Sequence, residues 1–240
     1  MCMPAEPIDL WLVKLDASAA ALEAIERKTP RLSDEDRARA ATFPDARTRL
    51  AAYCALRLII ERTAGASVRT QPFARDRSGK PRLDGVGIAF NLAHTHAFAL
   101  IAVTRQATVG IDLEQVRPIT MAQHHQDAIR AAGEGLARAP LPDGDAEHAF
   151  LQAWARLEAF TKARGVALQR TLEDVGVRGR NGRTTNARIR VSARRLAHRA
   201  HLAVAGVPLP PGLHGAIAAP RLPARLRAPL LPADRAGLEA

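Results

Sequence analysis

Two carboxylates, Asp112 and Glu114, stand two residues apart in the stretch V-G-I-D-L-E at residues 109–114. In a β-strand both side chains would point to one face, and the apolar residues beside them to the other. Each carboxylate makes the other harder to ionise. A cation between them removes that cost, and Mg²⁺ prefers such hard oxygen ligands. The pair is therefore a candidate magnesium site. The alternative is a solvent-facing acidic pair on an edge strand, and this motif taken alone favours that alternative.

A third acid can reach the same place from a helix. Trp154, Glu158 and Lys162 recur every four residues in the segment 146–165, so a helix puts them on one stripe. If that helix packs beside the acidic strand, Glu158 faces the acidic pair and Lys162 stands next to it. Three acids with a lysine suit chemistry on a metal-bound pyrophosphate. The alternative is a tryptophan in the core and a surface ion pair between Glu158 and Lys162.

Hydrophobic periodicity and turn residues divide the rest of the chain into strands and helices. The first half is predicted to hold a strand at 8–15, helices at 18–28, 33–43 and 45–64, and two or three strands within 90–114. The second half is predicted to hold helices at 120–138 and 146–165 and short strands at 172–177, 187–191, 201–207 and 213–218.

This order of elements predicts a mixed α/β (α+β) fold, because strands and long helices occur in both halves. A junction is expected near residues 105–110, which gives an N-terminal half at 1–107 and a C-terminal half at 108–219. The remaining residues, 220–240, are rich in Pro, Ala and Arg. We expect this tail to be poorly ordered or to lie on the surface.

Composition narrows the function classes. The chain of 240 residues has a formal net charge of +11, and 31 of its basic residues are arginine. A basic surface attracts polyanions such as nucleic acid, a phosphorylated cofactor or an acidic protein. The arginines look scattered along the sequence, which disfavours a nucleic-acid-binding arm. Cys2 and Cys54 do not suggest a disulfide, and no apolar run is long enough for a membrane span. We expect a cytoplasmic protein with no membrane partner.

A lysine stands in the tripeptide Gly79-Lys80-Pro81. The glycine permits a tight turn and the proline fixes its own backbone, so the Lys80 side chain would be held in place. An ordinary surface lysine in a turn fits the tripeptide equally well.

These segments together resemble the 4′-phosphopantetheinyl transferases, and the surfactin-synthetase-activating type in particular. The resemblance rests on V-G-I-D-L-E (109–114), W-A-R-L-E-A-F-T-K (154–162), G-K-P (79–81) and F-N-L-A-H-T (90–95), which occur in the family's order and at similar spacing. It covers roughly residues 33–207. The resemblance implies transfer of the 4′-phosphopantetheine arm of coenzyme A to a serine of an acyl or peptidyl carrier protein, releasing adenosine 3′,5′-bisphosphate.

The family resemblance also implies roles for individual residues. Mg²⁺, with Mn²⁺ as a substitute, would be bound by Asp112, Glu114 and Glu158, and Glu158 would also help to deprotonate the serine. The phosphates and adenine of coenzyme A would be contacted by Lys162, Lys80, Pro81 and His94, with Arg37, Arg39, Arg47 and Arg49 as further candidates. The implied fold is a pseudo-twofold pair of similar α/β halves with the active site at their interface. We expect a monomer that acts on an acidic carrier protein.

Two departures from the family pattern bear on activity. Leu157 stands where the family often has a lysine before the glutamate, and Arg156 beside it would point elsewhere on the helix. Ala93 replaces a frequent serine and removes a possible hydroxyl donor to a phosphate. A protein that binds coenzyme A without turning it over therefore stays an alternative.

Two other classes stay open. His94 and His96 would share one face of a strand and, with Asp112, could bind zinc, although no third strong ligand motif accompanies them. The positive charge also permits a basic nucleic-acid-binding module, but aromatic side chains are scarce at 4% and no helix-turn-helix or finger signature occurs. We therefore expect no nucleic acid partner.

Overall fold

The chain folds into two compact units. The computed structural model describes residues 6–76, 79–137, 139–142, 145–178 and 184–239. The N-terminal unit comprises Pro7–Ala107 together with Arg227–Ala240, and the C-terminal unit contains Thr108–Leu226. Both units combine helices with small antiparallel sheets, so the predicted mixed α/β class is confirmed.

The elements of the N-terminal unit follow in chain order: β1 (Ile8–Lys14), α1 (Leu15–Lys28), α2 (Asp34–Ala41), α3 (Ala46–Ala64), the 3₁₀ turn η1 (Ala66–Val68), β2 (Ala74–Arg75), β3 (Pro81–Arg82), β4 (Ala89–His94), β5 (Phe98–Thr104) and α8 (Arg235–Glu239). The elements of the C-terminal unit are β6 (Gly110–Gln115), α4 (Gln123–Leu136), α5 (Ala146–Arg164), α6 (Leu168–Val175), α7 (Asn186–Arg199), β7 (Ala203–Val207) and β8 (Leu213–Ala219).

The main sheets of the two units have the same topology. The N-terminal sheet has the order β1-β5-β4 and the C-terminal sheet the order β6-β8-β7, and all four pairings are antiparallel. In each sheet the last strand along the chain lies in the centre, between the first strand and the strand that precedes it. A separate two-stranded ribbon, β2-β3, belongs to the N-terminal unit.

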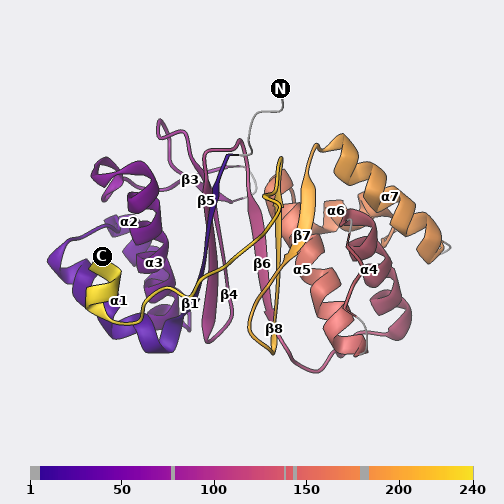
Figure 1. Cartoon of the computed structure of the whole chain (residues 1–240), viewed down its shortest axis with the longest axis horizontal. Coiled ribbons are helices and arrows are strands. Elements are labelled where there is room, and N and C mark those ends of the chain that lie inside the picture. Colours follow the sequence, from indigo (N-terminus) through magenta and orange to yellow (C-terminus); the bar gives the residue numbers. More distant parts are fainter. Residues whose placement is uncertain (1–5, 77–78, 138, 143–144, 179–183, 240) are drawn as a thin grey trace. The chain divides into compact units, whose positions relative to one another are not determined.

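Within the N-terminal unit, α3 packs against the sheet while α1 and α2 pack on α3 (Figure 1). The core is aliphatic because the chain has few aromatic residues. Ser33 caps α2, since its Oγ accepts a hydrogen bond from the Asp36 backbone N–H at 3.2 Å. Arg57, only 1% exposed, ties α2 to α3 by donating hydrogen bonds to the Asp36 carboxylate and the Gln71 carbonyl.

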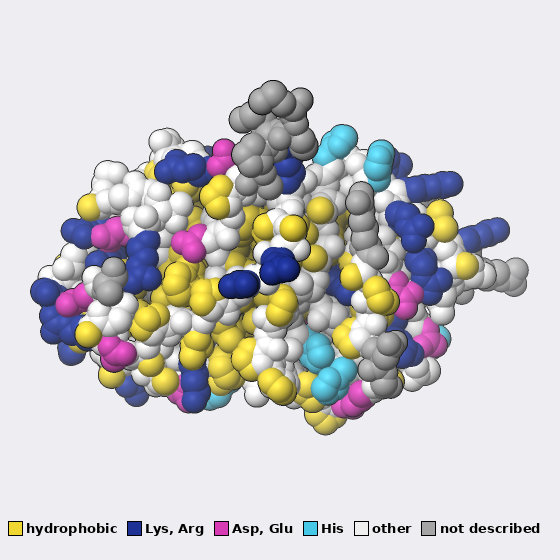
Figure 2. All heavy atoms as spheres, viewed as in Figure 1, with side chains coloured by type: hydrophobic (Ala, Val, Ile, Leu, Met, Phe, Trp, Pro, Cys, Tyr) yellow, Lys and Arg dark blue, Asp and Glu magenta, His cyan; other side chains and the backbone are white. Residues whose placement is uncertain are grey.

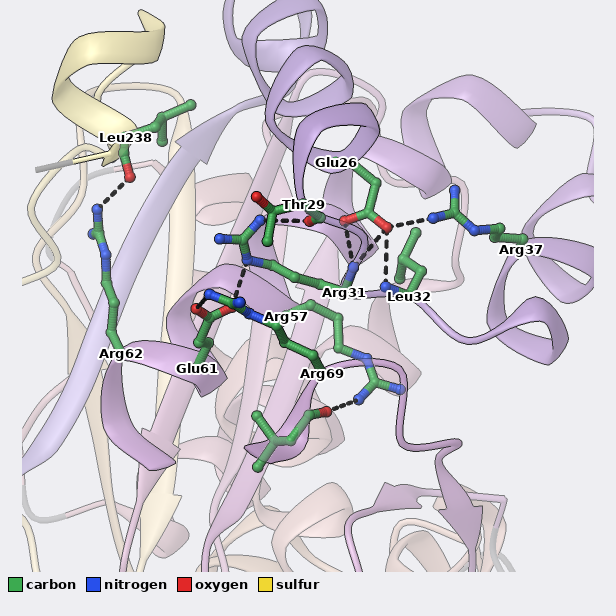
Figure 3. A network of polar contacts seen from close by, with 11 residues as sticks. Glu26, Thr29, Arg31, Leu32, Arg37, Arg57, Glu61, Arg62, Arg69 and Leu238 are labelled. Carbon is green, nitrogen blue, oxygen red and sulfur yellow. Dashed lines mark hydrogen bonds and ion pairs between the residues drawn. The ribbon is translucent and has the colours of Figure 1, made fainter. Parts of the chain in front are cut away.

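Charged side chains join the ends of α1 and α3 (Figure 3). Glu26 accepts hydrogen bonds from the backbone N–H groups of Arg31 and Leu32, and Arg31 also forms an ion pair with Glu61 at 2.6 Å. A cavity of about 500 Å³ lies beside this network and is lined by Arg31, Glu61 and Arg69 among others. Arg69 pairs with Glu61 as well. The cavity lining as a whole carries an excess of positive charge, with Lys28, Arg31, Arg62 and Arg69 against Glu61 and Glu239.

The segment after Pro220 differs from the expectation of a loose tail. The Leu12 backbone N–H donates to the Pro229 carbonyl at 3.0 Å, and Leu231 donates back to the Leu12 carbonyl at 2.7 Å. Leu231 and Leu238 are 0% and 1% exposed within the N-terminal core. The Pro, Ala and Arg content suggested disorder, but these spaced leucines bury enough apolar surface to hold the segment in place.

The C-terminal unit is layered on its sheet. Helix α5 packs on β6 and β8, α4 packs on α5, and α7 packs on α4 (Figure 1). Helix α5 begins at the cap Asp145, whose carboxylate accepts from the Glu147 backbone N–H at 2.8 Å, and ends at Gly165 with φ of +65°. Both ends agree with the predicted helix at 146–165.

Two predicted strands of this unit are helices instead. The segments 172–177 and 187–191 lie in or beside α6 and α7. Short windows of branched apolar residues suggested strands, but the buried residues of α7 are Ile189, Ala193, Leu196 and Ala197, which have helical spacing. The predicted strands at 201–207 and 213–218 are confirmed as β7 and β8. No helix among the described residues is long and apolar enough to cross a membrane.

Candidate active site

The site is built where helix α5 touches strand β6. Gly110, Asp112 and Glu114 alternate along β6 and therefore share one face. A Cβ on Gly110 would lie 2.1 Å from the Ala159 carbonyl oxygen and 2.3 Å from the Ala163 nitrogen, both backbone atoms of α5. Only glycine allows this approach. The glycine of V-G-I-D-L-E thus lets α5 lie directly against the face of the strand that carries the two acids.

Lys162 joins the helix to the strand. Its ammonium nitrogen lies 2.6 Å from Asp112 Oδ1, in a hydrogen-bonded ion pair. The Asp112 residue is only 6% exposed. Its second oxygen, Oδ2, is buried and has no hydrogen-bond partner among the described residues. A buried carboxylate oxygen without a donor is costly unless another group binds there.

The three predicted acids influence one another's ionisation. Burial raises the pKa of Asp112, against the opposing effect of Lys162. Burial raises the pKa of Glu114, the charge of Asp112 raises it further, and Arg117 at 3.1 Å opposes both. Burial also raises the pKa of Glu158 despite Lys162, with Asp112 and Glu114 adding to the effect. Burial of all three carboxylates, and the effect of Asp112 on both glutamates, create a demand for added positive charge.

The donor chemistry suits a divalent cation, although the side chains as they lie do not form a closed cage. Across the described residues, no group of three or more His, Cys, Asp or Glu side chains is spaced to hold a metal ion. Three hard carboxylates and the orphaned Asp112 Oδ2 nevertheless provide the oxygen ligands that Mg²⁺ requires. Metal binding would need side-chain rotation of Glu114 or Glu158 toward that oxygen. The same finding gives no support to the zinc hypothesis based on His94, His96 and Asp112.

Two of the predicted cofactor contacts meet in the N-terminal unit. Arg49 and His94 both lie 3.5 Å from Asp45, Arg49 at Oδ1 and His94 at Oδ2. The Arg49 guanidinium also stacks on the Phe43 ring at 3.7 Å. Burial would raise the pKa of Asp45, but Arg49 and His94 together lower it. The start of α3 and the end of β4 thus bring an arginine and a histidine to one place.

The other early arginines are not brought to that place. Arg37 pairs with Glu26, and Arg47 lies 3.4 Å from Glu23, so both are engaged with acids of α1. Arg39 is exposed on α2. Their positions give no reason to prefer them over Arg49 as ligands of a phosphate.

Lys80 and Pro81 lie at the β2–β3 turn. The Lys80 backbone N–H donates to Asp76 Oδ1 at 3.0 Å, and the Asp76 N–H donates to the Lys80 carbonyl at 3.1 Å. Gly79 has φ of +82°, the left-handed conformation that the turn needs. Burial lowers the pKa of Lys80 to about 8, against the charge of Asp76. The Lys80 backbone is therefore held in its turn.

The two departures from the family pattern lie in the protein interior. Leu157 is 0% exposed and packs in the core of the C-terminal unit, so this position cannot present a charge to solvent. Arg156 points elsewhere, as expected, and donates to the carbonyls of Ala139 and Pro140 at 2.9 and 2.8 Å. Ala93 is 5% exposed on β4.

Sequence reasoning missed a histidine pair beside the acids. His214 on β8 stands opposite Glu114 in the β6–β8 register, and its ring lies 4.9 Å from that of His148 on α5. His214 is 8% exposed, and burial, followed by His148, lowers its pKa. The two residues are 66 positions apart, so no local spacing could have indicated this contact.

Comparisons with known proteins find sequence similarity to one family. Residues 108–210 match the model of the 4′-phosphopantetheinyl transferase superfamily. The chain is 29% identical over 182 residues to the 4′-phosphopantetheinyl transferase HetI of Nostoc sp., which covers 72% of this chain and 74% of HetI. It is 32% identical over 145 residues to the 4′-phosphopantetheinyl transferase psf-1 of Bacillus pumilus, which covers 59% of this chain and 61% of psf-1.

The matched region, 108–210, contains both the acidic strand and the helix that packs on it. The two named relatives extend the similarity over more than half of the chain. Over residues 108–210 the chain is therefore similar to the 4′-phosphopantetheinyl transferase superfamily.

Proposed function

We propose that this protein transfers the 4′-phosphopantetheine arm of coenzyme A to a serine of an acyl or peptidyl carrier protein, with release of adenosine 3′,5′-bisphosphate. The observation that carries the proposal is the set of Asp112, Glu114, Glu158 and Lys162 inside the region that matches the family: Lys162 pairs with Asp112 at 2.6 Å, and burial and the charge of Asp112 raise the pKa of both glutamates. We further propose that the protein is a cytoplasmic monomer.

Each residue has a distinct part in the proposed reaction. Glu158 accepts the proton of the serine hydroxyl, directly or through water, while the serine oxygen forms a bond to the phosphorus that carries the pantetheine arm. The bond from this phosphorus to the adenosine bisphosphate breaks, and the leaving group takes the electron pair. Lys162 donates to the phosphate oxygens as charge shifts onto the leaving group.

Asp112, Glu114 and Glu158 would hold a divalent cation, Mg²⁺ or Mn²⁺, which when bound supplies charge neutralisation for the pyrophosphate. Lys80, Pro81, His94 and Arg49 are the proposed contacts of the cofactor's phosphates and adenine. Because Leu157 is buried, Lys162 is the lysine of this motif that can contact a phosphate. The alternative function, coenzyme A binding without transfer, depends on whether this one lysine is sufficient for catalysis.

Intact mass spectrometry tests the proposed function. The protein is incubated with coenzyme A, Mg²⁺ and a panel of apo carrier domains from fatty-acid, polyketide and peptide assembly. We expect a mass gain equal to one phosphopantetheine on at least one carrier, and none when its acceptor serine is replaced by alanine. Coenzyme A binding without any mass gain over the whole panel would favour the non-catalytic alternative.

Lys162→Gln is expected to slow transfer by about 10²–10³-fold because a donor to the migrating charge is lost. It should also lower stability at neutral pH, since Asp112 would keep a buried charge without its partner at 2.6 Å. Transfer rates and urea midpoints of the variant and of Lys28→Gln, an exposed lysine of α1, provide the comparison. If Lys162→Gln has the same transfer rate and urea midpoint as Lys28→Gln, Lys162 is only a member of a surface ion pair and has no part in transfer.

Coenzyme A affinity is expected to fall as pH rises through about 8, because burial lowers the pKa of Lys80 to about 8 and only the ammonium form attracts phosphate. The free energy of unfolding should change in the opposite direction. Lys80 keeps its proton to higher pH in the unfolded chain than in the folded one, so burial of the charged lysine lowers stability below about pH 8. Stability should rise as pH increases above about 8 and the folded lysine loses its proton. Lys80→Arg should keep its charge and flatten the affinity profile between pH 7 and pH 9. Identical profiles in calorimetric titrations would remove Lys80 from the cofactor site.

A further inference from the structure

The positive charge of this chain is concentrated in one stretch. Residues 175–233 contain eleven arginines and not one aspartate or glutamate. The other residues hold 24 Lys and Arg against 24 Asp and Glu, so this stretch accounts for the whole formal charge of +11. The arginines are spread along the sequence, but those of residues 175–233 have no acidic residues among them. The surface that this stretch forms is therefore expected to be strongly basic.

Helix α7 presents much of this charge on one side. Its buried side, formed by Ile189, Ala193, Leu196 and Ala197, packs into the core of the C-terminal unit. Its opposite side carries Arg188, Val191, Arg194, Arg195, His198 and Arg199, all exposed, at the three- and four-residue spacing of a single helix face. Lys and Arg side chains gather over this outer helix in the space-filling view (Figure 2). We call these six residues the α7 face.

The arginines of the α7 face differ from those elsewhere in the fold. Arg190, which points from α7 toward α4, pairs with Glu134 at 2.6 Å. Arg188, Arg194, Arg195 and Arg199 have no ion pair with any residue that the structure describes. Like charges at helical spacing repel one another and weaken the helix. A helix face that keeps four such charges is suited to an anionic partner.

The composition of the α7 face favours a protein over other polyanions. Its apolar side is already packed on α4, so the helix has no free apolar face to insert into a bilayer. It carries no Phe, Tyr or Trp, the side chains that form most stacking platforms for bases, and His198 is its one aromatic ring. Val191, 48% exposed, lies in the middle of the basic residues. An apolar point surrounded by arginines resembles a small protein interface, in which carboxylates pair with the rim.

We infer that the α7 face docks an acidic helix of the carrier protein that is modified, an inference that rests on the proposed function. Arg188 and Arg199 span eleven residues, or about 16 Å of helix, which matches roughly three turns of a partner helix. Helix α4 lies between α7 and α5, so the docked surface is about two helix diameters from Glu158. A carrier domain of about 100 residues is wide enough to bridge this separation. The α7 face would therefore bind the body of the carrier, while the carrier's serine lies at Glu158.

The test uses two double variants of equal charge. Arg188→Gln/Arg195→Gln removes two charges from the α7 face, and the control Arg27→Gln/Arg105→Gln removes two exposed charges from the N-terminal unit. We measure transfer kinetics with the carrier and coenzyme A varied separately, and binding of the same fluorescent apo acyl and peptidyl carrier domains without coenzyme A at 50 and 300 mM salt. A DNA duplex serves as a second probe.

The α7 variant is expected to raise the KM for the carrier about tenfold, with kcat and the KM for coenzyme A unchanged, and to lose most of the salt dependence of carrier binding. The control should match the wild type. Equal carrier binding by the α7 variant and the wild type overturns the inference, as does a loss confined to DNA. The binding experiment decides the inference even if no carrier is modified, whereas absent transfer with normal α7-dependent binding counts against the proposed function alone.

Discussion

Glu158→Gln is expected to lose transfer by about 10²–10⁴-fold while still binding coenzyme A. The amide keeps the shape of the side chain but cannot accept the serine proton and is a weaker metal ligand. Glu147→Gln in the first turn of the same helix is the matched control and should retain activity. Near-normal turnover of Glu158→Gln, with the carrier and coenzyme A both saturating, would refute the assigned role.

The same variant carries a prediction for stability. Burial, with Asp112 and Glu114 as neighbours, raises the pKa of Glu158 above its unfolded value. The folded state therefore holds the proton to higher pH, and the stability that this proton provides is lost as pH rises through the folded pKa. Without added metal, Glu158→Gln should be more stable than the wild type at pH 7 by on the order of 1 kcal/mol. The difference should shrink toward pH 4, as urea unfolding at both pH values would reveal.

Gly110→Ala is expected to give the largest loss of stability, about 3 kcal/mol or more, together with loss of transfer. The added Cβ would meet the Ala159 carbonyl oxygen at 2.1 Å and the Ala163 nitrogen at 2.3 Å. Both are backbone atoms, so α5 as a whole must move away from β6. That movement would carry Glu158 and Lys162 away from Asp112.

Gly206→Ala in β7 is the matched control for this substitution. Its Cβ would lie 3.3 Å from Nε2 of the Gln152 side chain, so a shift of that amide by a few tenths of an ångström, small enough to keep its hydrogen bond to the Gly215 carbonyl, would relieve the contact. We expect a loss below about 1 kcal/mol and retained activity. Urea midpoints and transfer rates of both variants decide the matter. Equal, small effects at Gly110 and Gly206 would mean that α5 does not need the close approach to β6.

Local patterns predicted the elements of the site well. The spacing of Asp112 and Glu114 specified a strand face, and the four-residue recurrence of Glu158 and Lys162 specified a helix stripe. Both periodicities follow from backbone geometry alone. The structure adds that Lys162 pairs with Asp112 across 50 positions of sequence, a contact that depends on the packing of α5 on β6.

Local patterns did not predict contacts between distant segments, or periodicities that extend over many residues. The short apolar windows at 172–177 and 187–191 looked like strands, and only the buried spacing from Ile189 to Ala197 distinguishes a helix. The proximity of His214 to His148 depends on strand register and helix packing together. Leu231 and Leu238 enter the N-terminal core from a segment whose composition resembles a disordered tail.

The pairing of Arg49 and His94 with Asp45 is another contact of this kind. The family resemblance suggested four early arginines as phosphate ligands, and only packing separates Arg49 from Arg37 and Arg47, which pair with Glu26 and Glu23. A helical pattern gives the face of each arginine but not the acid that it meets on a neighbouring helix.

Manganese binding tests most directly the claim that Asp112, Glu114 and Glu158 share one cation. Electron paramagnetic resonance counts free Mn²⁺ in titrations of the wild type, Asp112→Asn, Glu158→Gln and the control Glu147→Gln. We predict one Mn²⁺ per wild-type or control chain and at least a tenfold weaker affinity in the two site variants. Unchanged Mn²⁺ affinity in both Asp112→Asn and Glu158→Gln would contradict the account.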